Sequence, residues 1–200
     1  MSKVTVGATM SLDGFIAGPN DTGFDLLFRW YGNGDVVTTT PNPDISFSMT
    51  PEDTDHLRSL LERTGCLVVG RHLYDLTNGW GGRHPMDVPV VVLTHNPPAD
   101  RPQADENFVF VTEGIEAAVA KAREIAGTKD VGLNSGTIAR QALEAGLIDE
   151  VHIDLVPVLL GAGTPYFGQF ADAPVELVQE SAWASKGVVH LAYTVVRRGE

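Results

Sequence analysis

The chain has 200 residues, enough to bury the core of one domain. Its formal net charge of −12 argues against a nucleic-acid partner, whose phosphates would be repelled. The single cysteine, Cys66, excludes a disulfide within the chain and lies in an apolar run typical of a buried, inert thiol. No apolar run approaches the length of a membrane span, and the start lacks the apolar stretch of a signal peptide, so we expect a cytoplasmic protein without a membrane partner.

The first fifty residues predict one strand, a tight turn and a long irregular segment. Lys3–Thr9 alternates with β-branched residues, which predicts a strand. Asp13-Gly14 predicts a tight turn, followed by a short apolar return over Phe15–Ala17. Residues 21–50 are the least regular part of the chain, and we expect one or two helical turns over Phe24–Tyr31 and a short strand or extended loop over Val36–Thr40. A loop this long in a compact domain is usually functional or lid-like, although its aromatic residues can equally cap the core.

The middle of the chain predicts strands separated by helices. Thr50 precedes Pro51 and two acidic residues, which is the pattern of a capped helix start. A second, long amphipathic helix is expected from Ile115 to Ala126 and ends at Gly127. Buried strands are expected at Cys66–Val69, Val88–Thr94 and Phe108–Val111.

The chain is organised around Val131–Phe167, which predicts strand, turn, helix and second strand. Val131–Leu133 is the first strand, and Ser135 or Thr137 is placed to cap the helix that follows. A small-residue turn that leads into a helix N-terminus is suited to anions, because the free N–H groups and the helix dipole point at the ligand. An ordinary capped helix start has the same appearance, so this stretch alone does not decide between the two.

The order of elements predicts an α/β fold in one domain over residues 1–200. Strands separated by helices imply parallel pairing with right-handed crossovers. Val175–Glu180 and Val188–Val196 are expected to form a late antiparallel hairpin at the edge of the sheet, with Trp183–Gly187 turning between them. The exposed edge that Val188–Val196 would present makes a homodimer plausible.

Three separated motifs resemble the RibD C-terminal domain family, which belongs to the dihydrofolate-reductase-like proteins. The opening stretch Ala8–Ala17 is similar to the family's first motif, and Val69–Tyr74 resembles its second, in which Gly-Arg follows a strand. Gly146–Val151 and Pro157–Gly163 resemble the third, G-L-x-D-E followed by P-V-x-L-G-x-G. Order and spacing agree along nearly the whole chain.

The resemblance implies a dihydrofolate-reductase-like three-layer αβα fold with a mostly parallel central sheet. It also implies an NADPH-dependent reductase that commonly forms a homodimer and transfers hydride to a C=N or C=O of a small heterocyclic substrate. The 5-amino-6-(5-phosphoribosylamino)uracil reductase of riboflavin biosynthesis and dihydrofolate reductase are the activities it points to. No metal is implied.

The resemblance also assigns cofactor roles by position. Ala8 and Ile16 match backbone groups that hold the nicotinamide, and Arg71 is the natural partner of a 2′-phosphate, which favours NADPH over NADH. Leu133 and Asn134 stand where the family usually has Gly, so their side chains are expected to crowd the pyrophosphate. The implied cofactor-binding residues are Ala8, Ile16, Gly70, Arg71, His72, Thr94, His95, Asn96, Leu133, Asn134, Ser135, Gly136, Thr137, Ile138 and Gly161.

Asp13 is the leading candidate for a catalytic, proton-handling carboxylate, because reduction of C=N requires a proton at nitrogen. A local Asx bond in its turn is an equally good interpretation. The candidate substrate residues are Asp25, Trp30, Tyr74, Trp80, Glu150 and Leu159. Each has a structural alternative: a solvated acid for Asp25, core packing for the aromatic residues, a salt bridge for Glu150 and a tight turn for Leu159.

Two other functions remain open from the sequence. The altered phosphate loop is compatible with a non-catalytic nucleotide-binding or sensor protein on the same fold. A flavin- or deazaflavin-linked reductase is the third alternative. Fold by itself never decides the reaction.

Overall fold

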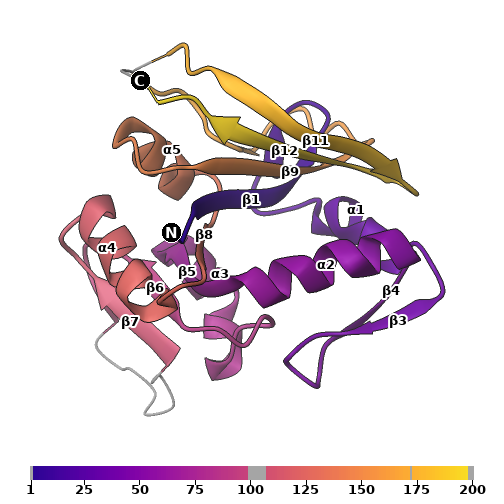
Figure 1. Ribbon diagram of the computed structural model, residues 1–200, viewed down its shortest axis with the longest axis horizontal. Coiled ribbons are helices and arrows are strands. Elements are labelled where there is room, and N and C mark those ends of the chain that lie inside the picture. The colour runs from indigo at the N-terminus through magenta and orange to yellow at the C-terminus, as the bar shows by residue number, and fades with distance from the viewer. Residues whose placement is uncertain (1, 99–106, 172, 198–200) are drawn as a thin grey trace.

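The computed structural model describes residues 2–98, 107–171 and 173–197 and is built on an eight-stranded sheet (Figure 1). The sheet has the order β11-β12-β9-β1-β8-β5-β6-β7, and the strands from β9 to β7 pair in parallel. β12 pairs antiparallel with β9 and with β11, as the expected edge hairpin. The strands are β1 Val4–Ser11, β5 Thr64–Gly70, β6 Val90–Leu93, β7 Phe108–Val111, β8 Asp130–Leu133, β9 Glu150–Val156, β11 Leu177–Ser185 and β12 Val188–Val195.

Helices cover both faces of the sheet and give three layers. On one face, α4 (Ile115–Ala126) and α5 (Thr137–Glu144) pack on alternate strand residues such as Val4, Val6 and Val68. On the other face lie α2 (Pro51–Arg63) and α3 (Arg71–Leu76), which cover the alternate residues. The period of two along each strand therefore divides the core into two sides.

Residues 21–50 form more regular structure than their sequence indicates. The expected helical turns are α1 (Phe24–Leu27) and the 3₁₀ helix η1 (Phe28–Gly32). The hairpin of β3 (Val36–Thr39) and β4 (Ser46–Met49) follows, of which only the first strand had a sequence signal. The remaining short elements are β2 (Phe15–Ala17), which pairs with β10 (Thr164–Pro165), and the 3₁₀ helix η2 (Asn78–Gly82).

The N-termini of α2 and α5 differ in how they are capped. The hydroxyl of Thr50 accepts the backbone N–H of Asp53 at 3.2 Å, as its sequence pattern predicts. The start of α5 is different: its N-cap is Gly136 at φ 78°, without a side-chain cap. The prediction that Ser135 or Thr137 caps this helix is therefore wrong. Gly136, with its positive φ, occupies the N-cap position, and Ser135 precedes that position.

The C-terminal hairpin needs a second correction. β11 continues to Ser185, so Trp183 lies in a strand and not in the turn. β11 is also the edge of the sheet, whereas β12 is paired on both sides. At this end of the sheet, the strand open to edge-to-edge association is therefore β11 and not Val188–Val196; β7 is the edge at the other end. Within the described ranges, no helix has both the length and the apolar character needed to cross a membrane.

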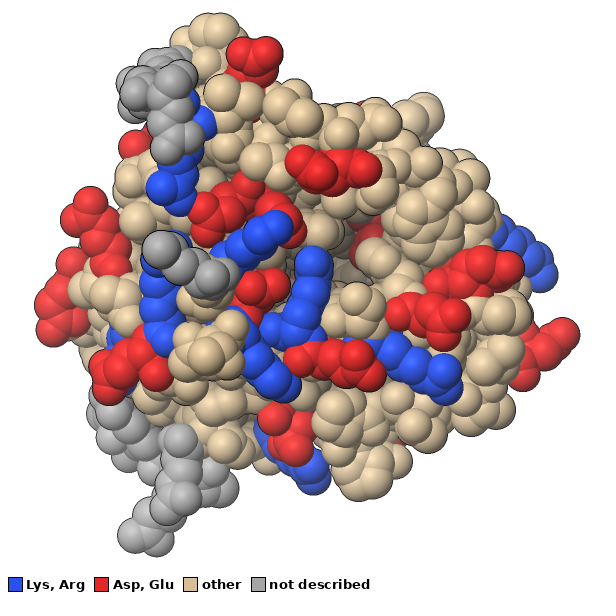
Figure 2. Space-filling view, in the orientation of Figure 1, with Lys and Arg blue, Asp and Glu red and all other residues tan. Residues whose placement is uncertain are grey.

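Acidic and basic side chains are intermixed on the surface that Figure 2 shows. The net charge of −12 is thus not gathered there into a field of one sign. Such mixing suits solubility more than the binding of a polyelectrolyte.

Candidate active site

A cavity of about 940 Å³ lies between the sheet and the layer of α2 and α3. Its floor is made by small side chains of β1 and β8, including Thr5, Gly7 and Gly132, which point away from the α4–α5 side. Because these residues are small, they leave unfilled space between the sheet and α2. The volume is at the upper end of the roughly 300–1,000 Å³ typical of small-molecule sites.

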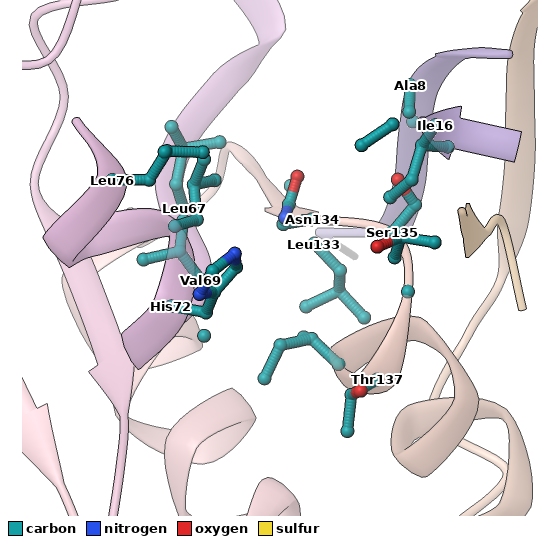
Figure 3. Close-up of a pocket in the computed structure, with 18 of the residues that line it drawn as sticks. Ala8, Ile16, Leu67, Val69, His72, Leu76, Leu133, Asn134, Ser135 and Thr137 are labelled. Carbon is teal, nitrogen blue, oxygen red and sulfur yellow. The ribbon is translucent and has the colours of Figure 1, made fainter. Parts of the chain in front are cut away.

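One end of the cavity gathers nearly all the predicted cofactor residues. The carboxyl ends of β5, β6 and β8 meet there with the starts of α3 and α5, which is where open α/β sheets bind ligands. Figure 3 shows Val69 and His72 on one side of the space and Ile16, Ser135 and Thr137 on the other. The predicted residues that line it are Ala8, Ile16, Gly70, Arg71, His72, Thr94, His95, Asn96, Leu133, Asn134, Ser135, Gly136, Thr137 and Ile138.

Ser135 is the most informative of these residues. It is 4% exposed, and its Oγ is the one buried side-chain polar atom in the described part of the chain that has no hydrogen-bond partner. An unsatisfied buried hydroxyl is costly and unusual in a folded protein. Ser135 lies at the cavity wall beside the N-terminus of α5, a position suited to an anion.

Leu133 and Asn134, expected to crowd a pyrophosphate, are both anchored to the sheet. Leu133 is 2% exposed and packs in the core beneath α4 and α5, on the same face as Val131. Asn134 is tied back to β5, where its backbone N–H donates to the carbonyl of Val68 at 2.9 Å. Both residues line the cavity together with Ser135, so their effect on a pyrophosphate stays a prediction.

The two predicted phosphate ligands on α3 are already engaged by carboxylates. The Nε of Arg71 donates to Asp75 at 2.7 Å, one turn along the helix, and its Nη1 donates to the carbonyl of Asn96. His72 lies 3.0 Å from Asp21, which belongs to the loop after β2. Arg71 therefore reaches the cavity with part of its charge neutralised.

Asp13 lies outside the cavity, which corrects its expected catalytic role. Its Oδ1 accepts the hydroxyl of Ser11 at 2.6 Å, and its Oδ2 accepts the backbone N–H of Gly161 at 2.7 Å. The hydrogen bond from Ser11 lowers the pKa of Asp13 most; burial opposes it, and the backbone N–H groups of Gly161 and Leu160 lower the pKa further, so the net pKa is lowered. Asp13 thus holds the loop of Leu159 and Gly161, two further predicted site residues that are not among the described residues lining the cavity.

The predicted substrate residues also lie elsewhere. Asp25 is exposed on α1, and Trp30 is buried in the core beside α2, where its Nε1 donates to Thr9 at 3.2 Å. Tyr74 and Trp80 pack in the core cluster around Phe108. Glu150 forms ion pairs with Lys3, His152 and Arg63, as in its structural alternative. Aromatic residues near loops are core residues in each of these cases.

The end of the cavity opposite α3 is lined by residues that we did not predict. They come from η1, α2 and β9 and are Tyr31, His56, Leu60, Arg63, His152 and Asp154. A signal was present in the sequence: His152 and Asp154 alternate with apolar residues inside the strand Val151–Val156, so both point to one face. Polar residues at alternate positions of a central strand indicate a cavity on that face.

Asp154 connects this end of the cavity to a buried ionic network. Its Oδ1 lies 2.7 Å from Nδ1 of His190 on β12 and 3.4 Å from Nε2 of His56 on α2. The Nε2 of His190 lies 3.0 Å from the carboxylate of Asp53 at the start of α2. Burial raises the pKa of Asp154, but the bonds from His190 and His56 outweigh it, and the net pKa is lowered. Asp154 is therefore an anion at the cavity wall.

Comparison with known proteins agrees with this architecture. The Bacillus subtilis (strain 168) protein YyaP is 25% identical over 203 residues, which is 96% of this chain and 94% of that protein. A putative riboflavin biosynthesis protein from Shewanella sp. PV-4 matches with a TM-score of 0.74 and 24% identity, over 98% of this chain and all of that one. Dihydrofolate reductase from Enterococcus faecalis, solved in complex with NADP(H) and RAB-propyl, matches with a TM-score of 0.57 and 16% identity over 96% of both chains.

These structures show the fold, which is the predicted dihydrofolate-reductase-like arrangement. The family model described as the RibD C-terminal domain matches residues 2–191. That match covers nearly the whole chain and confirms the resemblance seen in the three motifs. The chain therefore belongs to the RibD C-terminal domain family.

Proposed function

We propose that the protein is an NADPH-dependent reductase that transfers hydride to a C=N or C=O of a small heterocyclic substrate. Membership of the RibD C-terminal domain family supports a reductase-like role. The observation that carries the proposal is Ser135, whose buried hydroxyl lies without a partner where the cavity meets the start of α5. The 5-amino-6-(5-phosphoribosylamino)uracil reductase and dihydrofolate reductase reactions are the two chemical models.

The residues of the α3–α5 end fit a dinucleotide. Ser135 and Thr137 would hold its pyrophosphate through side-chain hydroxyls and the N-terminus of α5, while the backbone N–H of Gly136 is bound to the carbonyl of Tyr166 at 2.7 Å. Ala8 and Ile16 would border the nicotinamide, and Gly136 lies within reach of Ile16, since a Cβ built on it would lie 3.6 Å from that side chain. NADPH, when bound, supplies the hydride.

The opposite end fits a flat polar ring. Phe24, Phe28 and Tyr31 supply apolar walls, and Tyr31 is held between Trp30 and Phe47 by ring contacts at 4.2 and 4.5 Å. Asp154 supplies a fixed negative charge that favours substrates with N–H donors. The cavity is continuous between the two ends, so the two ligands can meet above β1.

The experiment is a turnover screen that follows the loss of NADPH absorbance. The probes are 7,8-dihydrofolate, 5-amino-6-(5-phosphoribosylamino)uracil and the simple bicyclic imine 3-phenyl-2H-1,4-benzoxazine. We expect oxidation of NADPH with at least one probe and much slower oxidation of NADH. Binding of NADPH without turnover of any probe would favour the alternative, a nucleotide-binding or sensor protein.

We also propose that the protein forms a homodimer through the edge strand β11 instead of through Val188–Val196. This strand is exposed along most of its length and carries the exposed apolar residues Leu177 and Val178. An open edge of this kind is a ready site for pairing with a second chain. Light scattering would show twice the chain mass, and charged substitutions at Leu177 and Val178 would reduce it to a monomer. A monomeric wild-type protein would contradict the proposal.

A further inference from the structure

The proposed reduction of C=N needs a proton at nitrogen as well as a hydride at carbon, and Asp13 lies too far from the cavity to provide it. The titratable groups at the β9 end of the cavity are Tyr31, His56, His152 and Asp154, with the permanently charged Arg63 beside them. Their contacts differ enough to identify the one that can donate.

Three of these groups are poor donors at neutral pH. Burial, helped by the charge of Asp154, raises the pKa of Tyr31, so its hydroxyl is a weak acid. Asp154 has a lowered pKa and holds no proton to give. Burial lowers the pKa of His152 despite the opposing effect of Glu150, with Arg63 lowering it further, and the Nε2 of His152 is bound to Glu150 at 2.9 Å.

His56 differs in both contact and position. Its Nε2 lies 3.4 Å from Oδ1 of Asp154, so the carboxylate holds the imidazole ring at the wall of the cavity. The side chain is 27% exposed. It lines the main cavity and also a second pocket of about 110 Å³ between α2 and the strands β9, β11 and β12. The same ring thus faces the substrate space on one side and a separate polar pocket on the other.

The groups that face His56 come from three neighbouring elements. Asp154 on β9 is anionic, and the ring of His190 on β12 lies 4.3 Å away. Trp183 on β11 contacts the imidazole edge-on at 5.7 Å. On α2 itself, Asp55 points to solvent with 81% exposure and pairs with Arg58. Asp154 is therefore the carboxylate that orients His56 from across the cavity wall.

A metal ion is a competing interpretation of this cluster. Ligating atoms of His56, Asp154 and His190 lie within 4.8 Å of one another. Both ring nitrogens of His190, however, point at carboxylates, Nδ1 at Asp154 and Nε2 at Asp53. Carboxylates accept and do not donate, so both nitrogens must carry protons, and neither keeps a lone pair for a metal. The cluster is an ionic network with His56 at its open end.

We propose that His56 is the catalytic proton donor of the reduction, with Asp154 as its positioning residue. This inference rests on the proposed reductase function. The imidazolium of His56 gives its proton to the substrate nitrogen while the carbon receives hydride, so that C=N becomes a C–N single bond with new C–H and N–H bonds. His56 is left neutral and regains a proton from water through the second pocket.

The main test measures kcat against pH for the wild type, His56→Gln and Asp154→Asn, on whichever of the three screened probes the wild type reduces. His56→Gln should lower kcat by about 100-fold or more, with a small change in KM, and should remove the decline of kcat with rising pH. Asp154→Asn should lower kcat less than His56→Gln does, since the ring remains but loses the carboxylate that positions it. Asp55→Asn is the matched control on the same helix and should leave the profile unchanged.

A bypass experiment separates proton donation from a general structural effect. The N-methyl cation of 3-phenyl-2H-1,4-benzoxazine already carries its positive charge, so its reduction needs no acid. His56→Gln should keep wild-type activity with this cation while losing activity with the neutral imine. A readout without turnover is the ¹⁵N spectrum of the His56 ring, identified by its loss in His56→Gln, which should change on addition of the neutral imine.

Two results overturn the inference. Equal losses on the neutral and cationic probes, or a kcat–pH profile of His56→Gln that matches the wild type, would show that His56 donates no proton. A wild type that binds NADPH but reduces none of the probes would instead show that the proposed function fails, and the inference would fail with it.

Discussion

Asp53 and His190 form a buried ion pair that joins the start of α2 to strand β12. The Nε2 of His190 lies 3.0 Å from Oδ1 of Asp53, and their side chains are 2% and 0% exposed. The second ring nitrogen of His190 reaches Asp154 at 2.7 Å, so one imidazolium is held between two carboxylates. Asn33 and Ser185 complete the shell around Asp53 at 2.6 and 2.8 Å. The wall of the cavity is therefore built on a satisfied ionic network.

Replacing His190 with leucine should destabilise the fold strongly. The substitution leaves two carboxylates close together and removes the positive charge between them. Loss of one partner of a buried pair costs about 3–5 kcal/mol. Urea unfolding of His190→Leu measures this, with His72→Leu as the control, since the side chain of His72 is 75% exposed. Equal stability of the two variants would contradict a structural role for the network.

The contribution of the network to stability should depend on pH. Burial alone lowers the pKa of His190, but the bonds and charges of Asp154 and Asp53 outweigh it, and the net pKa is raised from 6.5. Stabilisation by His190 is therefore complete below pH 6.5 and is lost as the pH rises through the raised pKa. For Asp53, burial raises the pKa, but its hydrogen bonds outweigh burial and the net pKa is lowered. The stabilisation that Asp53 contributes is therefore lost only as the pH falls below 3.8.

The difference in unfolding free energy between the wild type and His190→Leu tests whether the stabilisation by His190 is lost as the pH rises. It should be larger at a pH of about 5.5 than at a pH of about 8.5. A difference that grows as the pH rises would mean that His190 is buried as a neutral ring.

Replacing Ser135 with alanine should separate ligand binding from stability. Without NADPH the variant should be as stable as the wild type or more stable, because the hydroxyl has no partner to lose. The variant should bind NADPH more weakly by roughly 10- to 100-fold, since one hydrogen bond to a charged group is lost. Calorimetry and thermal unfolding measure the two effects. Ser46→Ala, at an exposed position of β4, is the control. A destabilised free protein with unchanged NADPH affinity would make Ser135 a structural residue only.

Replacing Asp13 with asparagine should have little effect on the chemical step. Its carboxylate holds the loop of Leu160 and Gly161 and does not reach the cavity. We expect a lower melting temperature and a kcat within about 3-fold of the wild type, far from the 10²–10⁴-fold loss of a proton donor. A loss in that larger range would restore Asp13 as the catalytic acid.

The parts of the molecule that the sequence predicts well are those with local signals. β7 and α4 have the predicted bounds, Phe108–Val111 and Ile115–Ala126, because alternation and helical spacing are visible within a few residues. The cofactor end of the cavity can be predicted from the sequence for a similar reason. Its residues come in short motifs at strand ends, and parallel pairing brings those ends to one edge.

The substrate end is not local, and for that reason it was missed. His56, Asp154 and His190 lie on three elements that are far apart in the sequence, and each resembles an ordinary polar residue in its own segment. Only the pairing of β12 with β9, which sets His190 opposite Asp154, brings them together. The predictions for three aromatic residues were wrong for a different reason. Aromatic side chains near loops are suited to a binding wall, but Trp30, Tyr74 and Trp80 pack in the core.

A calorimetric titration of the purified protein with NADPH, and separately with NADH, tests the central claim most directly. We predict one NADPH per chain with an affinity clearly tighter than that for NADH, and a weaker NADPH affinity in Ser135→Ala. Arg71 lines the same end of the cavity and favours the 2′-phosphate despite its pairing with Asp75. If neither nucleotide binds, the cavity is not a dinucleotide site, and the proposed reductase function is wrong.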